Sequence, residues 1–144
     1  CARGVPCGAF DSCPSHDAGG RFFSDFEVIP RRYVGQVIRN NMGDKREEYY
    51  DKAGVGSCYL FRLDEDCIVD ATRRGHIGRF INHCCSPNAY AKTVEIGPHT
   101  RKIVIIALKD IKAGEEVMYD YKFPIEDDKI PCYCGAPNCK GTMN

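Results

Sequence analysis

The chain has 144 residues, which is the size of one domain, and 43% of them are hydrophobic, enough for one modest core. No run approaches the roughly 18 apolar residues that a membrane-spanning helix needs, so no membrane span is expected. The 20 Lys and Arg residues balance the 20 Asp and Glu residues, and a net charge of zero argues against strong non-specific binding of nucleic acid.

The N-terminal part of the chain starts without a periodic pattern. Residues 1–20 are rich in glycine, serine and cysteine and are predicted to form a loop. Two β-rich segments follow. The first covers residues 22–29 and is ended by Pro30, and the second covers residues 33–38, where Gly35 indicates the close approach of another backbone. Both segments are predicted to be strands.

A short helix is predicted over residues 43–54. Asp44 is a suitable N-cap, and Glu48 and Lys52 form an i,i+4 pair of opposite charge. Gly54 follows the last helical residue and is expected to end the helix.

The rest of the chain favours short strands. Two pairs of β-rich segments flank polar turns, which is the pattern of β-hairpins. The pairs are 57–63 and 67–71 around the turn 64–66, and 89–96 and 102–108 around the turn 97–101. A turn or short helix is predicted near residues 73–82, and a further strand over residues 117–121. Six or seven short strands with little helix predict a mainly β fold.

Ten cysteines are many for a chain in which no export signal is recognisable. A framework of disulfides is one explanation, but Cys84 and Cys85 are adjacent, and Cys132 and Cys134 are separated by one residue. Neither pair can form an internal disulfide without strain. In a reducing environment such clusters bind metal more often than they form disulfides, so a zinc site is predicted over a disulfide framework or inert thiols.

The segment "CYCGAPNC" supplies three of the four ligands that a closed structural zinc site requires. They are Cys132, Cys134 and Cys139. The fourth must come from elsewhere in the chain, and the residues alone leave both Cys84 and Cys85 as candidates. Either choice would fix the C-terminal segment to the middle of the domain.

Several tyrosines lie on predicted strands. Alternation along a strand places Tyr119 and Tyr121 on the same face, and Tyr33 and Tyr59 lie on earlier strands. Each tyrosine taken alone is better explained as a core aromatic residue of the sheet than as a functional residue. Together they could line a narrow channel around a lysine, whose pKa desolvation would lower so that its neutral amine attacks an electrophile.

Three segments carry a resemblance to a known family: "RFINHCCSPN" (79–88), "GEEVMYDYKFPIED" (114–127) and "CYCGAPNC" (132–139). They resemble the C-terminal half of a SET-domain lysine methyltransferase with its post-SET zinc motif. The segments "YVGQVIR", "SCYLFRLDED" and "IVDATRRGHIGRF" extend the match over residues 33–144. The run "YDYKFPIED" before a terminal cysteine cluster is similar to the COMPASS (trithorax-like) subfamily, whose substrate is lysine 4 of histone H3.

The resemblance implies a SET domain of short curved sheets, with a knot-like threading of the C-terminal segment and a post-SET zinc cluster. It places the SET domain at residues 33–123 and the post-SET zinc-binding segment at residues 124–144. Residues 1–32 do not match the strands and glycine-containing loop with which the family opens, and form a divergent N-terminal segment.

The resemblance also implies roles for single residues. Asn82, His83 and Tyr121 match contacts of the methyl donor, S-adenosyl-L-methionine. Tyr121 is also the catalytic tyrosine that orients the lysine amine, and Tyr119 is the position that limits how many methyl groups fit. The remaining channel residues are Tyr33 and Tyr59.

For the metal, the resemblance selects Cys85 as the fourth zinc ligand and makes Cys84 a bystander. The implied set of ligands to one structural Zn²⁺ ion is Cys85, Cys132, Cys134 and Cys139.

The resemblance implies an active histone H3 lysine 4 methyltransferase in nuclear chromatin. Its implied partners are the N-terminal tail of histone H3 and COMPASS-like scaffold subunits of the WD-repeat and SPRY types. The alternative is a catalytically impaired, zinc-stabilised chromatin-interaction module, which the unmatched N-terminal segment favours. Measured binding of S-adenosyl-L-methionine would separate the two.

Overall fold

The structure, a computed structural model, describes residues 31–98 and 100–144. The strand predicted over residues 22–29 lies outside them. Contacts divide the described residues into two units, the first formed by residues 31–81 and 91–106 and the second by residues 82–90 and 107–144. No helix among the described residues has the length and apolar character needed to cross a membrane.

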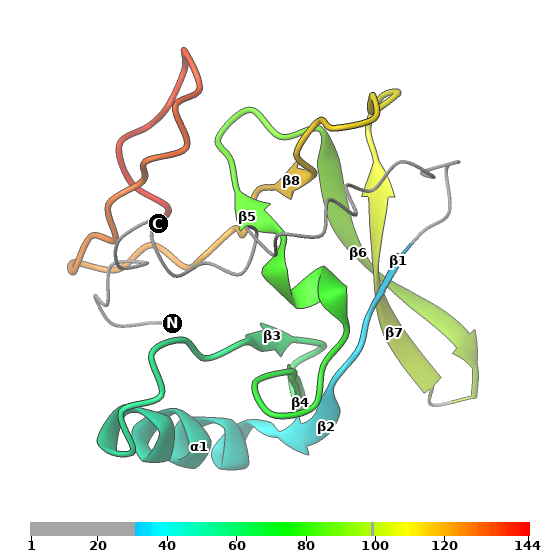
Figure 1. Cartoon of the computed structure of the whole chain (residues 1–144). Helices are drawn as coiled ribbons and strands as arrows, with labels where there is room; N and C mark the ends of the chain where they lie inside the picture. The colour runs from blue at the N-terminus through cyan, green and yellow to red at the C-terminus, as the bar shows by residue number, and fades with distance from the viewer. Residues whose placement is uncertain (1–30, 99) are drawn as a thin grey trace. The chain divides into compact units, whose positions relative to one another are not determined.

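The first unit contains a three-stranded antiparallel sheet in the order β2-β4-β3 (Figure 1). Its strands are β2 (Gln36–Arg39), β3 (Leu60–Arg62) and β4 (Cys67–Asp70). Strands β3 and β4 form the first predicted hairpin, which is confirmed. Its turn is held by Asp64, whose Oδ1 accepts the backbone N–H groups of Asp66 and Cys67 at 2.9 and 2.8 Å.

The single strand predicted over residues 33–38 is wrong, because the chain changes sheets at Gly35. Strand β1 (Arg31–Tyr33) pairs with β7 (Thr100–Ala107), whereas β2 pairs with β4. A Cβ atom at Gly35 would lie 2.5 Å from the carbonyl oxygen of Asp70. The predicted close approach of a backbone at Gly35 is therefore confirmed, and it explains why no other residue fits there.

Helix α1 (Asn40–Lys52) begins three residues before the predicted range of 43–54 and contains Asp44, so the prediction of Asp44 as the N-cap is wrong. Arg39 occupies the N-cap position and makes no side-chain capping hydrogen bond. Instead, the backbone N–H of Asn40 donates to the carbonyl of Asp66 at 2.9 Å, and its side-chain amide donates to the carbonyl of Glu65. The β3–β4 turn, rather than a local cap, fixes the start of the helix.

The predicted end of helix α1 is confirmed. The Lys52 ammonium lies 2.6 Å from the Glu48 carboxylate, as an i,i+4 pair should. Gly54 then adopts a φ of 67°, in the left-handed region that favours glycine.

The core of the first unit is formed by residues on or next to strands β1, β3, β4 and β7. Strand β7 has β1 on one side and β6 (Ala89–Gly97) on the other, which confirms the second predicted hairpin. Ile103 on β7 is 1% exposed, and burying such a side chain contributes about 1.5–3 kcal/mol. The buried cluster consists of Tyr33, Leu63, Val69, Ala71 and Ile103. A 3₁₀ helix, η2 (Ile77–Phe80), confirms the turn or short helix predicted nearby.

In the second unit, two strands far apart in sequence run parallel. Strand β5 (Asn82–His83) pairs with β8 (Met118–Tyr119), and Tyr119 also pairs with Ala89 at the start of β6. The C-terminal segment is thus inserted between two strands that precede it (Figure 1). Of the strand predicted over residues 117–121, only Met118 and Tyr119 form a strand, β8. The mainly β class is confirmed.

The buried side chain of Asn88 secures this insertion. Its Nδ2 donates to the Glu116 carbonyl at 2.8 Å and its Oδ1 accepts the Met118 N–H at 2.9 Å. The backbone carbonyl of Asn88 accepts the N–H of Leu108 at 2.8 Å. The buried Asn88 side chain therefore satisfies two backbone groups at the entry to β8.

Candidate active site and metal centre

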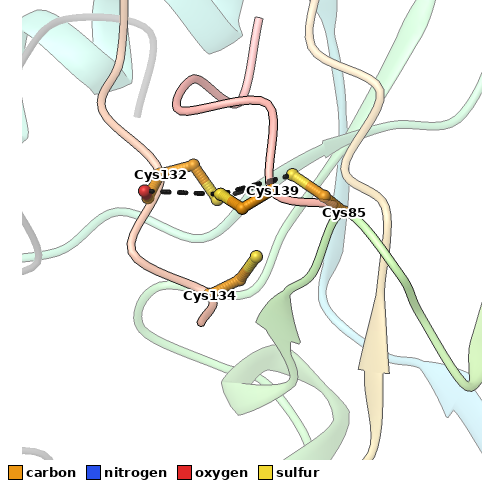
Figure 2. Close-up of side chains that lie close together, drawn as sticks. All are labelled: Cys85, Cys132, Cys134 and Cys139. Carbon is orange, nitrogen blue, oxygen red and sulfur yellow. Dashed lines mark hydrogen bonds between the residues drawn. The ribbon is translucent and has the colours of Figure 1, made fainter. Parts of the chain in front are cut away.

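Four cysteine sulfur atoms meet in the second unit, those of Cys85, Cys132, Cys134 and Cys139 (Figure 2). All four lie within 4.8 Å of one another. The Cys85 sulfur is 3.7 Å from that of Cys132 and 4.0 Å from that of Cys139. Tetrahedral coordination with Zn–S bonds near 2.3 Å separates sulfurs by about 3.8 Å, so the spacing suits a zinc ion.

The backbone around the cluster explains how an eight-residue segment supplies three of these sulfurs. Gly135 adopts a φ of 69°, which turns the chain sharply between Cys134 and Cys139. The N–H of Cys139 donates to the carbonyl of Ala136, and the N–H of Cys132 donates to the carbonyl of Gly141, both at 2.9 Å. Cys85 is the second residue after β5 (Asn82–His83), and this strand brings the fourth sulfur to the cluster.

The electrostatics of the cluster also suit a divalent cation. Backbone N–H groups of Cys85 and Ala136 donate to the Cys134 sulfur and lower its pKa to about 6, which favours the thiolate. Burial raises the pKa of Cys132 to about 12. A zinc ion would supply the positive charge that several neighbouring thiolates require, because metal binding displaces the thiol protons.

The structure distinguishes the two adjacent cysteines that the sequence left open. Within residues 31–98 and 100–144, the group of four sulfurs includes Cys85 and does not include Cys84. Cys84 is 3% exposed, and its sulfur accepts the N–H of Ser86 at 3.4 Å. Burial raises the pKa of the Cys84 thiol, and a hydrogen bond with the Cys134 sulfur raises it further, so Cys84 borders the cluster as a protonated thiol.

His83 connects the cysteine cluster to the aromatic residues. Its Nδ1 accepts the backbone N–H of Tyr121 at 3.2 Å, and its Nε2 lies 3.5 Å from the Cys85 sulfur. Burial lowers the pKa of His83, although Asp120 at 3.6 Å opposes this effect. A neutral ring with Nδ1 as acceptor is consistent with both contacts.

Asn82 precedes His83 on strand β5, and its side chain is exposed. Its Nδ2 donates to the Glu116 carboxylate at 2.7 Å. Glu116 was not among the residues predicted from the sequence. Its position two residues before β8, which pairs with β5, is the signal that a correct strand pairing would have provided.

Tyr121 lies at the centre of an aromatic group in the second unit. Its ring centroid is 5.3 Å from that of His83, 5.0 Å from that of Tyr119 and 5.2 Å from that of Phe123. Tyr119 is 5% exposed. The expected proximity of Tyr119 and Tyr121 is therefore observed, and Phe123 joins them.

The other two tyrosines belong to the first unit. Tyr33 is 7% exposed and packs edge-on against Phe61, with ring centroids 5.0 Å apart, so it is part of the core. Tyr59 packs edge-on against Phe80 at 5.6 Å. The role of Tyr33 and Tyr59 in a channel stays a prediction.

Comparison with known proteins identifies the class. The sequence model of the SET domain matches residues 20–122, and the chain belongs to the SET-domain family. Two similar relatives are the histone-lysine N-methyltransferase set1 of Dictyostelium discoideum, 57% identical over 112 residues, and the H3 lysine-4 specific histone-lysine N-methyltransferase of Schizosaccharomyces pombe, 56% identical over 112 residues. The histone-lysine N-methyltransferase trithorax of Drosophila melanogaster is 54% identical over 112 residues.

Each of these three alignments covers 78% of the chain. The chain in turn spans only 8%, 12% and 3% of the three relatives. These relatives confirm the predicted COMPASS (trithorax-like) subfamily. The match to the family begins at residue 20, so it includes part of residues 1–32, which were predicted to be a divergent N-terminal segment.

Proposed function

We propose that this chain transfers methyl groups from S-adenosyl-L-methionine to lysine 4 of histone H3. The observation that carries the proposal is its identity of 54–57% to relatives named histone-lysine N-methyltransferases, one of them named as specific for H3 lysine 4. The region matched by the family, residues 20–122, contains all six tyrosine, asparagine and histidine positions assigned to catalysis and methyl-donor binding.

Asn82, His83 and Tyr121 would hold the methyl donor. The donor, when bound, supplies a methyl group on a positively charged sulfur. The rings of Tyr121 and Phe123 offer faces that attract a cation, and the exposed Asn82 amide beside Glu116 offers polar partners for an amino acid or ribose group. These groups fit a charged nucleoside, and His83 holds the Tyr121 backbone in place through its Nδ1.

Tyr121 and Tyr119 would act on the lysine. Their rings lie 5.0 Å apart, with Tyr119 buried and Tyr121 half-buried, and a lysine inserted beside them would lose water, which disfavours its ammonium form and lowers its pKa. The tyrosine hydroxyls would orient the neutral amine without needing a strong base. Alignment and exclusion of water then account for most of the rate.

One zinc ion would be held by Cys85, Cys132, Cys134 and Cys139. Four thiolates complete a tetrahedral shell and leave no position for water, so the role of the metal is structural. It would join residues 132–139 to Cys85, two residues from His83. Loss of the metal would therefore disturb the methyl-donor residues as well as the C-terminal segment.

The wider setting follows from the same proposal. The chain would act in nuclear chromatin on the N-terminal tail of histone H3, with scaffold subunits of the WD-repeat and SPRY types as partners. The alternative of a non-catalytic module is not favoured, because the family match extends upstream to residue 20 and reduces the segment on which that alternative rested.

The test is methyl transfer by the zinc-loaded chain to a peptide of the histone H3 tail, followed by mass spectrometry. We expect methylation at lysine 4, none on a peptide with arginine in place of lysine 4, and a strong loss of rate in Tyr121→Phe. No transfer by the unmodified chain, or transfer to the arginine peptide, would overturn the proposal.

A further inference from the structure

The backbone of Tyr59 is held on both sides by the two residues that follow β4. Its N–H donates to the Thr72 hydroxyl oxygen at 2.9 Å. Its carbonyl accepts the N–H of Ala71 at 2.8 Å. Tyr59 directly precedes β3, so these two bonds extend the β3–β4 pairing by one residue, with a side chain replacing one backbone group.

Thr72 is in turn fixed by a buried carboxylate. Its N–H donates to Oδ1 of Asp70 at 2.9 Å, and Asp70 is 2% exposed. The second oxygen of Asp70 accepts hydrogen bonds from Arg46 at 2.6 Å and from the Tyr50 hydroxyl at 2.8 Å. Asp70 thus binds Thr72 with one oxygen and helix α1 with the other.

The ring of Tyr59 is held through the same segment. The Arg79 guanidinium carbon lies 5.5 Å from the centroid of the Tyr59 ring and 4.6 Å from that of Phe80. Arg79 also donates a hydrogen bond to the carbonyl of Ala71 at 2.8 Å. Ala71 therefore contacts both the backbone of Tyr59 and the guanidinium group that covers its ring.

We propose that Thr72 is a positioning residue for Tyr59, and that Asp70 connects this position to helix α1. The hydroxyl oxygen of Thr72 sets the backbone of Tyr59, and with it the place of the Tyr59 ring within the first unit. The chain Arg46–Asp70–Thr72–Tyr59 makes the position of a channel residue depend on how helix α1 sits on its sheet. The inference rests on the proposed methyl transfer only for the role of Tyr59.

The test compares Thr72→Val with Thr72→Ser in the full zinc-loaded chain. Valine keeps the branched shape and removes the acceptor, whereas serine keeps the acceptor. The first measurement is hydrogen exchange of the Tyr59 amide, which does not depend on activity. Loss of one hydrogen bond of ordinary strength should speed exchange roughly fivefold or more in Thr72→Val. Thr72→Ser should remain close to the unmodified chain.

The second measurement is steady-state methyl transfer to the histone peptide. Thr72→Val should lower kcat/KM for the peptide by roughly fivefold, leave the KM for S-adenosyl-L-methionine unchanged, and be rescued by Thr72→Ser. Thr93→Val is the matched control, because Thr93 donates to the Leu63 carbonyl at 3.3 Å in the same unit and makes no bond to Tyr59 among those described. It should leave the Tyr59 amide unchanged.

Equal exchange at Tyr59 in Thr72→Val and the unmodified chain would overturn the positioning role, as would an equal loss of kcat/KM in Thr72→Val and Thr72→Ser. If the unmodified chain transfers no methyl group, the proposed function fails. The exchange measurement still decides whether Thr72 positions Tyr59.

Discussion

Replacing each of two adjacent cysteines tests the metal centre with a control inside the chain. Cys85 lies in the group of four sulfurs and Cys84 does not, although the two residues are neighbours in sequence. Cys85→Ser should remove one zinc ligand. Cys84→Ser changes one buried sulfur outside that group. The Cys84 sulfur accepts the Ser86 N–H and contacts the Cys134 sulfur, and a serine hydroxyl can make both hydrogen bonds.

The size of the effect follows from the number of ligands. Structural zinc sites bind with about 10–16 kcal/mol, so each of four thiolates contributes about 2.5–4 kcal/mol. Loss of Cys85 should therefore weaken zinc binding roughly a hundred- to a thousandfold. The sulfur spacing of 3.7 and 4.0 Å around Cys85 places it fully within bonding geometry, so a smaller effect is not expected.

The measurement is competition for zinc against a chelator of known affinity, with metal content determined at equilibrium. The unmodified chain and Cys84→Ser should each hold one zinc ion per chain with similar affinity. Cys85→Ser should lose its zinc to chelator concentrations that leave the other two loaded. If Cys84→Ser loses zinc as readily as Cys85→Ser, the assignment of the fourth ligand is wrong.

Three further predictions concern the active site and the first unit. If Tyr119 lies beside the substrate lysine as proposed, Tyr119→Phe removes a hydroxyl that would occupy space near the amine. Mass spectrometry of the histone peptide should then show more di- and trimethyl-lysine than the monomethyl product expected of the unmodified chain, and equal product ratios would refute the role. His83→Ala removes the acceptor of the Tyr121 N–H, and calorimetry should show the affinity for S-adenosyl-L-methionine falling about tenfold or more; unchanged affinity would contradict it. Asp70→Asn leaves the Arg46 guanidinium facing an amide and should lower the free energy of unfolding by about 3 kcal/mol. Although burial opposes the effect, hydrogen bonds from Arg46, Thr72 and Tyr50 hold the pKa of Asp70 below its usual value. The stabilisation is therefore complete above the unfolded pKa of about 4 and is lost as pH falls through the folded pKa, so denaturation curves of the two proteins should converge only in acid.

The sequence predicted those elements whose cause is local. Both hairpins follow from β-rich segments beside polar turns, and the end of helix α1 follows from Gly54. The start of helix α1 was misplaced because its cause is distant in sequence, namely the bonds from Asn40 to the turn at Glu65 and Asp66. Local capping rules selected Asp44 instead, and nothing near residue 40 indicates the contact.

The same limit applies to the candidate site. Spacing predicted three of the four clustered cysteines, because they share one short segment. It left Cys84 and Cys85 open, because the choice depends on where the chain turns after β5. The bonds from Arg46 and Tyr50 to Asp70 join residues 24 and 20 positions apart, and no periodic pattern relates them. These bonds form only because helix α1 packs on strand β4, and that packing could not be predicted from the sequence.

The parallel pairing of β5 with β8 sets an order on folding. Asn82 finds its partner at Met118 and His83 at Tyr119, so neither can adopt its final place until that later strand has been synthesised. In the β3–β4 hairpin only residues 63–66 separate the two strands, so this pairing is available much earlier. During synthesis the first unit can therefore begin to pack while Asn82 and His83 still lie on an unpaired segment. The group of four sulfurs around Cys85 can form only later, once Cys139 has left the ribosome.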